Sequence, residues 1–307
     1  MKAVTVQSLI GCLRLLEQEH PSHKNDFAFL LFGLAEQYLR FVFGRNWVNQ
    51  ILYGIHPRVS RQKRPGRYFL RAEIEAADDR LRGQERAIRL AEILFNLQAV
   101  EGIDGRVSAL SDGPVEDTYA ELEAGHYLRR RGVSFQFVTA SGKRGLDYDG
   151  EILLPDGTKV NCEMKCKVES TQLSKASILS TLRYARRQLP RDELAIVFMK
   201  IPEAWLSQPE ISAVSEQALS DFFRSTSRVL AVVMRWEEVL LQPDGAGAIV
   251  YKYRLERNAQ VPRPPTAVST LLNSLDYQGD SAWVSFRTVV QAYITASPFD
   301  FRKRGSL

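Results

Sequence analysis

Cysteine and histidine are scarce in this sequence. Its 307 residues include three cysteines and four histidines, and no two cysteines form a Cys-x-x-Cys pair. Three cysteines cannot build a disulfide framework, which excludes a small secreted scaffold held together by disulfides. Cys162 and Cys166 fall on one expected strand about 13 Å apart, so they cannot bind the same zinc ion. We expect the thiols to be reduced.

Long apolar runs are also missing. The longest apolar stretch, residues 27–43, is interrupted by Glu36 and Arg40, whereas a membrane-spanning helix needs roughly 20 predominantly apolar residues. The first residues lack the charged start, the apolar middle and the small-residue cleavage site of a secretory signal. We therefore expect a soluble, cytoplasmic protein that has no membrane partner.

No sign of charge dominates, and two common catalytic motifs are absent. Lys and Arg number 41 against 36 Asp and Glu, which gives a formal net charge of +5. This small excess does not by itself indicate an anionic partner, because the clustering of the charges matters more than their sum. The chain contains neither Gly-x-x-x-x-Gly-Lys-[Ser/Thr] nor Gly-x-Ser-x-Gly, so ATPase and serine hydrolase activities have no support.

Hydrophobic periodicity predicts a helical N-terminal region followed by a sheet-centred core. The expected helices cover residues 27–44, 84–100, 114–131, 172–188 and 211–224, and the expected strands cover 133–138, 146–154, 159–168, 194–199, 228–241 and 249–255. The order α-β-β-β-α-β, then α-β-β, predicts an α/β fold with a mixed β-sheet flanked by helices, because the strand after the second helix needs a crossover to rejoin the sheet. The predicted regions are a helical part (1–110), a core (111–260) and, after a proline-rich break, a C-terminal extension (261–307).

The most informative segment is the predicted hairpin whose turn is Pro-Asp-Gly-Thr. Residues two apart in a strand share a face, so Glu163 and Lys165 point to the same side. The partner strand offers Asp147, Asp149 and Glu151 at the same period. If the register places both sets on one face, a carboxylate from each strand converges beside Lys165.

An acidic pair beside an ammonium group suits a divalent cation. Two carboxylates, a backbone carbonyl such as that of Met164, and water are typical ligands of Mg²⁺ or Mn²⁺. Glu121, on the preceding predicted helix, has Ala124 and Leu128 as neighbours on the helical wheel, so its carboxylate would need a compensating cation if this face packs on the sheet. Ordinary cross-strand charge pairing on a solvent-facing sheet accounts for the hairpin residues equally simply.

The order of these motifs resembles the PD-(D/E)XK nuclease superfamily. The resemblance covers residues 114–200 and consists of Glu121-Leu-Glu-Ala-Gly-His-Tyr-Leu-Arg-Arg-Arg-Gly132, a strand, Gly145-Leu-Asp147, Glu163-Met-Lys165 and a basic helix. It is closest in spacing to restriction-endonuclease-like and resolvase-like members. It implies a restriction-endonuclease-like fold, and Mg²⁺- or Mn²⁺-dependent hydrolysis of phosphodiester bonds in nucleic acid, in DNA rather than RNA.

The resemblance also implies a role for each catalytic candidate. Asp147 and Glu163 would ligate the metal, and Lys165 would position the attacking water. Glu121 would bind a second metal ion or orient a metal-bound water. Leu146, rather than proline, precedes the aspartate here, and Asp149 on the same face is the alternative metal ligand.

Basic residues near the hairpin are candidates for phosphate contacts. One residue continues the face of Lys165, three lie on the next expected helix, and two lie in a basic loop near residues 56–71. They are Lys167, Lys175, Arg183, Arg187, Arg61 and Arg64. The alternative is that they solubilise an ordinary amphipathic helix and a solvated loop.

Two other functions would account for the same residues. The chain would be a catalytically inactive nucleic-acid-binding or assembly module of the same fold, or an unrelated α/β protein with a charged sheet face. We expect the N-terminal helical region either to help recognise the substrate or to mediate assembly, with a second copy of the chain or with a partner protein.

Overall fold

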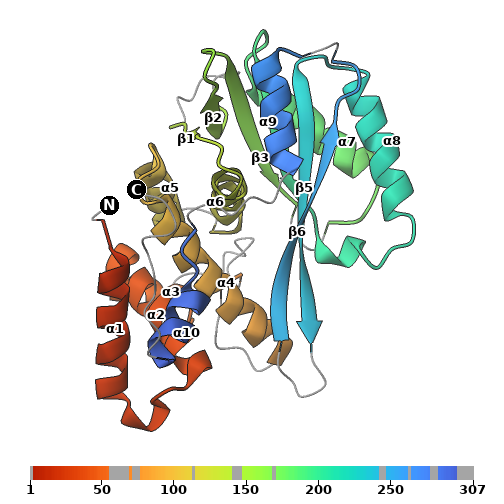
Figure 1. Cartoon of the computed structure of the whole chain (residues 1–307). Helices are drawn as coiled ribbons and strands as arrows, with labels where there is room; N and C mark the ends of the chain where they lie inside the picture. Colours follow the sequence, from red (N-terminus) through yellow and green to blue (C-terminus); the bar gives the residue numbers. More distant parts are fainter. Residues whose placement is uncertain are drawn as a thin grey trace. The chain divides into compact units, whose positions relative to one another are not determined.

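The chain folds into two compact units, which are each described separately. The computed structural model describes residues 3–54, 69–70, 77–112, 115–139, 147–167, 171–241, 247–261, 264–276 and 283–295 (Figure 1). A helical unit comprises residues 1–99, 107–115 and 280–307, and a sheet unit comprises residues 100–106 and 116–279. The predicted C-terminal extension is therefore divided between the two units.

The helical unit confirms the helices expected in the N-terminal region. Its elements are α1 (Val6–Glu19), η1 (Pro21–His23), α2 (Phe27–Phe43), α3 (Arg45–Ile51), α4 (Ala77–Leu97), the greater part of α5 (Ile103–Asp112) and α10 (Phe286–Ile294). The buried Glu92 of α4 attaches the C-terminal segment, because it accepts hydrogen bonds from Trp283 Nε1 at 2.6 Å and from the Phe286 amide at 3.0 Å. Among the described residues, no helix is long and apolar enough to cross a membrane.

The sheet unit contains a six-stranded sheet in the part of the chain that the structure describes. Its strands are β1 (Gln136–Phe137), β2 (Gly150–Leu153), β3 (Lys159–Cys166), β4 (Leu194–Lys200), β5 (Val229–Leu241) and β6 (Gly247–Arg257). They follow one another in chain order across the sheet; β3, β4 and β5 run parallel, and the other neighbours are antiparallel. The predicted α/β class and the mixed sheet are confirmed.

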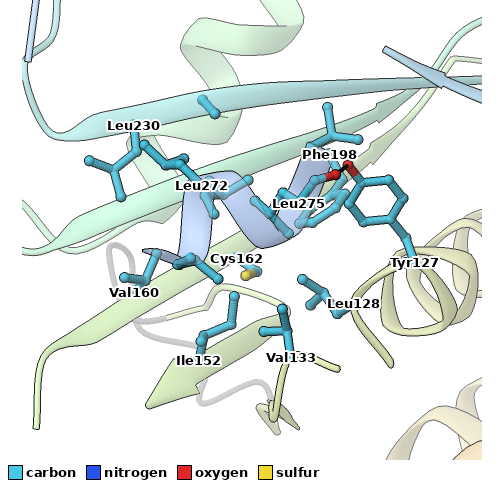
Figure 2. Packing of buried hydrophobic residues seen from close by; sticks show 14 of the residues in the cluster. Tyr127, Leu128, Val133, Ile152, Val160, Cys162, Phe198, Leu230, Leu272 and Leu275 are labelled. Atoms are coloured by element: carbon cyan, nitrogen blue, oxygen red, sulfur yellow. Dashed lines mark hydrogen bonds between the residues drawn. The ribbon is translucent and has the colours of Figure 1, made fainter. Parts of the chain in front are cut away.

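Helices cover both faces of this sheet. They are α6 (Val115–Arg130), α7 (Lys175–Gln188), α8 (Ile211–Phe223) and α9 (Thr266–Asp276), with the short η2 (Glu203–Trp205). One core lies between the sheet and α6 and α9, where the Tyr127 hydroxyl donates to the Leu275 carbonyl at 2.7 Å (Figure 2). The other core lies between the sheet and α7 and α8. Because α6 precedes β1 and α7 lies between β3 and β4, the predicted order α-β-β-β-α-β is confirmed.

The first two strands of this order are shorter than the sequence predicts. Residues 133–138 were expected to be a strand, but the Val133 amide donates to the Leu128 carbonyl at 3.1 Å and so closes the end of α6. Gly132 has the positive φ of 70° that this helix ending requires. β1 is therefore limited to two residues, because the amide of Val133 belongs to the helix and not to the sheet.

The hairpin that joins β2 to β3 forms as predicted. Gly157 adopts a φ of 83°, and the Thr158 amide donates to Asp156 Oδ1 at 2.9 Å. β2 begins at Gly150, which pairs with Cys162 of β3, and not at residue 146 as predicted. Immediately before it, Asp149 Oδ2 accepts the Met164 amide at 2.7 Å, so that a side chain takes up a backbone donor of β3.

β3 divides its residues between the two faces as its period predicts. Cys162 and Met164 belong to the core beneath α6 and α9. Lys165 lies on the opposite side, where its Nζ is 5.2 Å from the ring centre of Tyr184 on α7. Glu163 shares that side, since it lies two residues from Lys165 in the same strand.

Candidate functional site

An acidic cluster forms where α6, the start of β2 and β3 come together in the sheet unit. Its carboxylates are Glu121 of α6, Asp149 beside β2 and Glu163 of β3. The charge of Asp149 raises the pKa of both Glu163 and Glu121, so the three carboxyl groups lie close enough to affect one another. The structure thus brings together the acidic residue predicted on the helix, the one predicted on β3 and the alternative aspartate.

Arg106, which the sequence analysis did not select, connects two members of the cluster. Its Nη1 lies 2.8 Å from Glu121 Oε2, and its Nη2 lies 3.8 Å from Asp149 Oδ1. Nη2 also donates to the main-chain carbonyls of Asp149 at 2.8 Å and Val138 at 3.1 Å. Arg106 therefore fixes the start of β2 relative to α6.

The segment that carries Arg106 is fastened to β1. The Phe137 amide donates to the Glu101 carbonyl at 2.9 Å. A Cβ atom at Gly102 would lie 2.1 Å from the Phe137 carbonyl oxygen, and the φ of Gly102 is +80°. Only glycine allows this approach without a backbone shift, so this contact determines where Arg106 enters the cluster.

Glu163 is the most enclosed carboxylate of the cluster. Its side chain is 0% exposed, and among the described residues its carboxylate pairs only with the Lys165 ammonium group. No other hydrogen-bond donor satisfies its oxygens within the described part of the chain. A buried carboxylate in this situation is costly unless further positive charge reaches it.

The pKa values of the three carboxyl groups reflect this shortage of positive charge. Burial and then the charge of Asp149 raise the pKa of Glu163 to about 8, against the lowering effect of Lys165. Burial and Asp149 likewise raise the pKa of Glu121 to about 7, although Arg106 opposes the shift. Burial also raises the pKa of Asp149. Groups whose pKa is displaced by burial and by like charges together are typical of functional sites.

The structure favours Asp149 over Asp147 as the aspartate of this cluster. Asp149 makes the largest charge contribution to the raised pKa of both Glu121 and Glu163. Asp147 precedes β2, and its main-chain carbonyl accepts a hydrogen bond from Gln188 of α7 at 3.3 Å. The place of Asp147 in the motif predicted that residue instead, but β2 begins only at Gly150, and Asp149 is the aspartate that lies beside β3.

The donor set fits a hard divalent cation. Carboxylate oxygens are the preferred ligands of Mg²⁺ and Mn²⁺, and among the described residues the Glu163 carboxylate has no donor other than the Lys165 ammonium group. Among the described residues, no group of three or more His, Cys, Asp or Glu side chains is arranged to hold a metal ion. A magnesium site requires only one or two carboxylates, since water and substrate phosphate complete its coordination. The cluster meets this smaller requirement.

The predicted phosphate-binding residues have different surroundings. Lys175 is held by Asp221 of α8, with Nζ and Oδ2 2.6 Å apart. Lys167 is partly buried, which lowers the pKa of its ammonium group. Arg183 and Arg187 are exposed on α7. Arg61 and Arg64 lie outside the described residues.

Tyr184 is a second residue near the cluster that was not predicted from the sequence. Its ring is 52% exposed, and the guanidinium carbon of Arg187 lies 5.6 Å from the ring centre. Because the Lys165 ammonium group lies over the same ring, Tyr184 connects Arg187 of α7 to the acidic cluster. Its place beside Arg183 and Arg187 in a basic helix is the sequence signal that could have found it.

No family model, curated protein or solved structure matches the chain.

Proposed function

We propose that the sheet unit is a metal-dependent phosphodiester hydrolase with a restriction-endonuclease-like core. The observation that carries this proposal is the buried carboxylate of Glu163, paired with Lys165 and lying in a cluster with Asp149 and Glu121. The order α-β-β-β-α-β around the cluster supports the same fold. Within this class, we propose that the protein is a nuclease, and that DNA is its polymer substrate.

In this proposal, Asp149 and Glu163 would hold Mg²⁺ or Mn²⁺. The bound ion would stabilise negative charge on the phosphate and lower the pKa of a bound water. Asp149 keeps one carboxylate oxygen in a hydrogen bond to the Met164 amide, so its orientation is fixed before any ligand binds. Arg106 is a positioning residue, because it holds Asp149 and Glu121 without taking part in the reaction.

Lys165 is assigned two tasks in the reaction. Its ammonium group lies against Glu163, where it would neutralise charge on a phosphate and orient the attacking water. Glu121, whose pKa is raised to about 7, is suited to accept or release a proton near neutral pH. The exposed Arg183 and Arg187 would bind phosphates farther along the strand without reading the sequence.

The direct test is a cleavage assay on plasmid DNA, on oligonucleotides and on RNA of the same sequence. We expect cleavage with Mg²⁺ or Mn²⁺ and none with EDTA. Accumulation of nicked or linear plasmid would identify an endonuclease, and stepwise shortening of an end-labelled strand an exonuclease. No cleavage of any of these polymers with either metal ion would contradict the proposal.

A second function is a module that binds nucleic acid and does not cut it. It is favoured by one observation: among the described residues, no group of three His, Cys, Asp or Glu side chains is arranged to hold a metal ion. In that case the sheet unit would bind nucleic acid through Arg183 and Arg187 without cutting it. Salt-sensitive DNA binding, with no cleavage and no effect of Mg²⁺ on stability, would support this inactive module.

Metal binding should also change the stability of the protein in a pH-dependent way. The pKa of Glu163 is about 8 in the folded state, against an ordinary value of 4.5, so the folded state retains a proton that the unfolded state loses. Between pH 5 and 8 this carboxyl therefore lowers the free energy of unfolding by about 1.4 kcal/mol per pH unit. The stability of the protein with a protonated Glu163 is fully present below pH 4.5, and it is lost as the pH rises toward 8 and the buried group ionises. Mg²⁺ should restore stability, more at pH 8 than at pH 6.

Thermal unfolding with and without Mg²⁺ at these two pH values measures the effect. Glu163→Gln should remove the carboxyl's share of the pH dependence and the stabilisation by Mg²⁺. Glu216→Gln is the matched control, because the side chain of Glu216 is 61% exposed on α8, and it should behave as the wild type. Equal stabilisation of Glu163→Gln and wild type by Mg²⁺ would exclude Glu163 as a metal ligand.

A further inference from the structure

Tyr184 is a large aromatic side chain left in solvent beside the acidic cluster. On α7, Ile178, Leu182 and Ala185 are buried against the sheet, whereas Tyr184 is 52% exposed. Core packing explains the first three residues and does not explain an exposed ring between two arginines. Part of the ring is therefore accessible to a ligand.

In the described part of the chain, the charged groups that lie over this ring are two cations, Lys165 and Arg187. Lys165 Nζ lies 5.2 Å and the Arg187 guanidinium carbon 5.6 Å from the ring centre. Both distances fall within the range of cation–π attraction. Arg183 precedes the tyrosine and is exposed. An aromatic face bordered by cations matches a flat ring that is attached to a phosphate.

Lys165 places this aromatic face next to the proposed cleavage site. The same ammonium group contacts Glu163 on one side and the Tyr184 ring on the other. A base lying on Tyr184 would therefore belong to a nucleotide close to the phosphate at Glu163. The phosphate at Glu163 comes from the proposed function, so the inference about Tyr184 rests on that function.

We propose that Tyr184 is a stacking platform for an unpaired nucleobase, and that the substrate of this site is single-stranded nucleic acid or a single-stranded end or flap. Within a continuous duplex the faces of each base are covered by its neighbours, so an aromatic side chain can stack only on a base that has left the helix. Aromatic stacking combined with phosphate contacts from basic residues is the usual way of binding single strands.

The test measures binding to the full-length Glu163→Gln protein, which should not cut the probe. Fluorescence anisotropy with a labelled oligothymidylate and with a duplex of the same length gives the two affinities. Tyr184→Ala should weaken single-strand binding by about 5- to 100-fold and leave duplex binding nearly unchanged. Tyr184→Phe keeps the ring and should bind as its parent does. Leu240→Ala is the matched control, because Leu240 is 53% exposed in the same unit.

A series of oligonucleotides with one abasic nucleotide separates stacking from a structural effect. At one position of the strand, removal of the base should weaken binding by the same factor as Tyr184→Ala. The variant should not respond to that abasic position at all, because the base and the ring form one interaction. Equal losses for single strand and duplex, or unchanged single-strand binding by Tyr184→Ala, would overturn the inference.

The outcomes distinguish this inference from the proposed function. If wild type cleaves DNA with Mg²⁺ but Tyr184→Ala shows no single-strand defect, the stacking platform is wrong and the nuclease stands. If the ring-dependent single-strand binding is found and wild type cleaves nothing with Mg²⁺ or Mn²⁺, the platform stands and the nuclease is wrong.

Discussion

Lys165→Ala should lower the rate of Mg²⁺-dependent DNA cleavage by about 10²- to 10³-fold, because a fixed charge at the position of the reacting phosphate is lost. The substitution also removes the ammonium group that pairs with the buried Glu163. Lys165 lowers the pKa of Glu163, so its removal should raise that pKa further. The residual activity of Lys165→Ala should therefore require a more alkaline pH than the wild-type activity.

The same assay tests whether Asp149 or Asp147 is the aspartate of the proposed metal site. Asp149→Asn should lose cleavage to a similar extent, whereas Asp147→Asn should retain it, because Asp149 is the residue whose charge acts on Glu121 and Glu163. Circular dichroism and thermal unfolding of each variant control for loss of folding. Full activity of both Lys165→Ala and Asp149→Asn would exclude this cluster as the catalytic site, and loss of activity in Asp147→Asn alone would restore the sequence-based assignment.

The second large effect concerns the interior of the sheet unit and not the acidic cluster. Arg235 of β5 is buried, with its Nε 3.5 Å from Glu123 Oε2 and its Nη2 2.9 Å from Glu237 Oε1. Arg235→Ala removes the guanidinium group from both buried carboxylates. We expect the free energy of unfolding to fall by about 3–5 kcal/mol, because breaking a buried ion pair leaves charge in a medium that solvates it poorly.

Urea unfolding at pH 7 measures this loss. Arg254→Ala is the control: the side chain of Arg254 is 37% exposed and pairs with Glu256, so its loss should cost at most about 1 kcal/mol. The triple variant Arg235→Leu, Glu123→Gln, Glu237→Gln should recover part of the loss, because it leaves no unpaired charge among these three residues. A loss in Arg235→Ala no larger than in Arg254→Ala would show that the network contributes little.

α6 shows why one helix serves both the cluster and this network. Glu121 and Glu123 are two residues apart, so the helical turn directs them to different sides. Glu121 meets Arg106, while Glu123 meets Arg235 and accepts a hydrogen bond from the Tyr253 hydroxyl at 2.9 Å. The sequence singled out Glu121 by its small neighbours, and only the fold showed that Glu123 is the fully buried residue of the two.

The sequence by itself determined the features that depend on local chemistry. The order of helices and strands follows from hydrophobic period, the end of α6 from Gly132, and the hairpin from Asp156 and Gly157. The common face of Glu163 and Lys165 also follows locally, because alternate residues of any strand share a side. Because these features do not depend on distant residues, the hairpin and the common face of its glutamate and lysine could be predicted from the sequence.

The tertiary structure decided which residues complete the site. Arg106 joins the cluster through hydrogen bonds to the main-chain carbonyls of Val138 and Asp149, residues far from it in the sequence. Asp149, and not Asp147, lies in the cluster, because β2 begins only at Gly150. The Asp149 carboxylate, just before that strand, accepts a hydrogen bond from the Met164 amide of β3. Tyr184 is near Glu163 only through Lys165. Period and turn chemistry fix the direction of a side chain along its own element, whereas the start of a strand and the approach of a distant arginine depend on packing between elements.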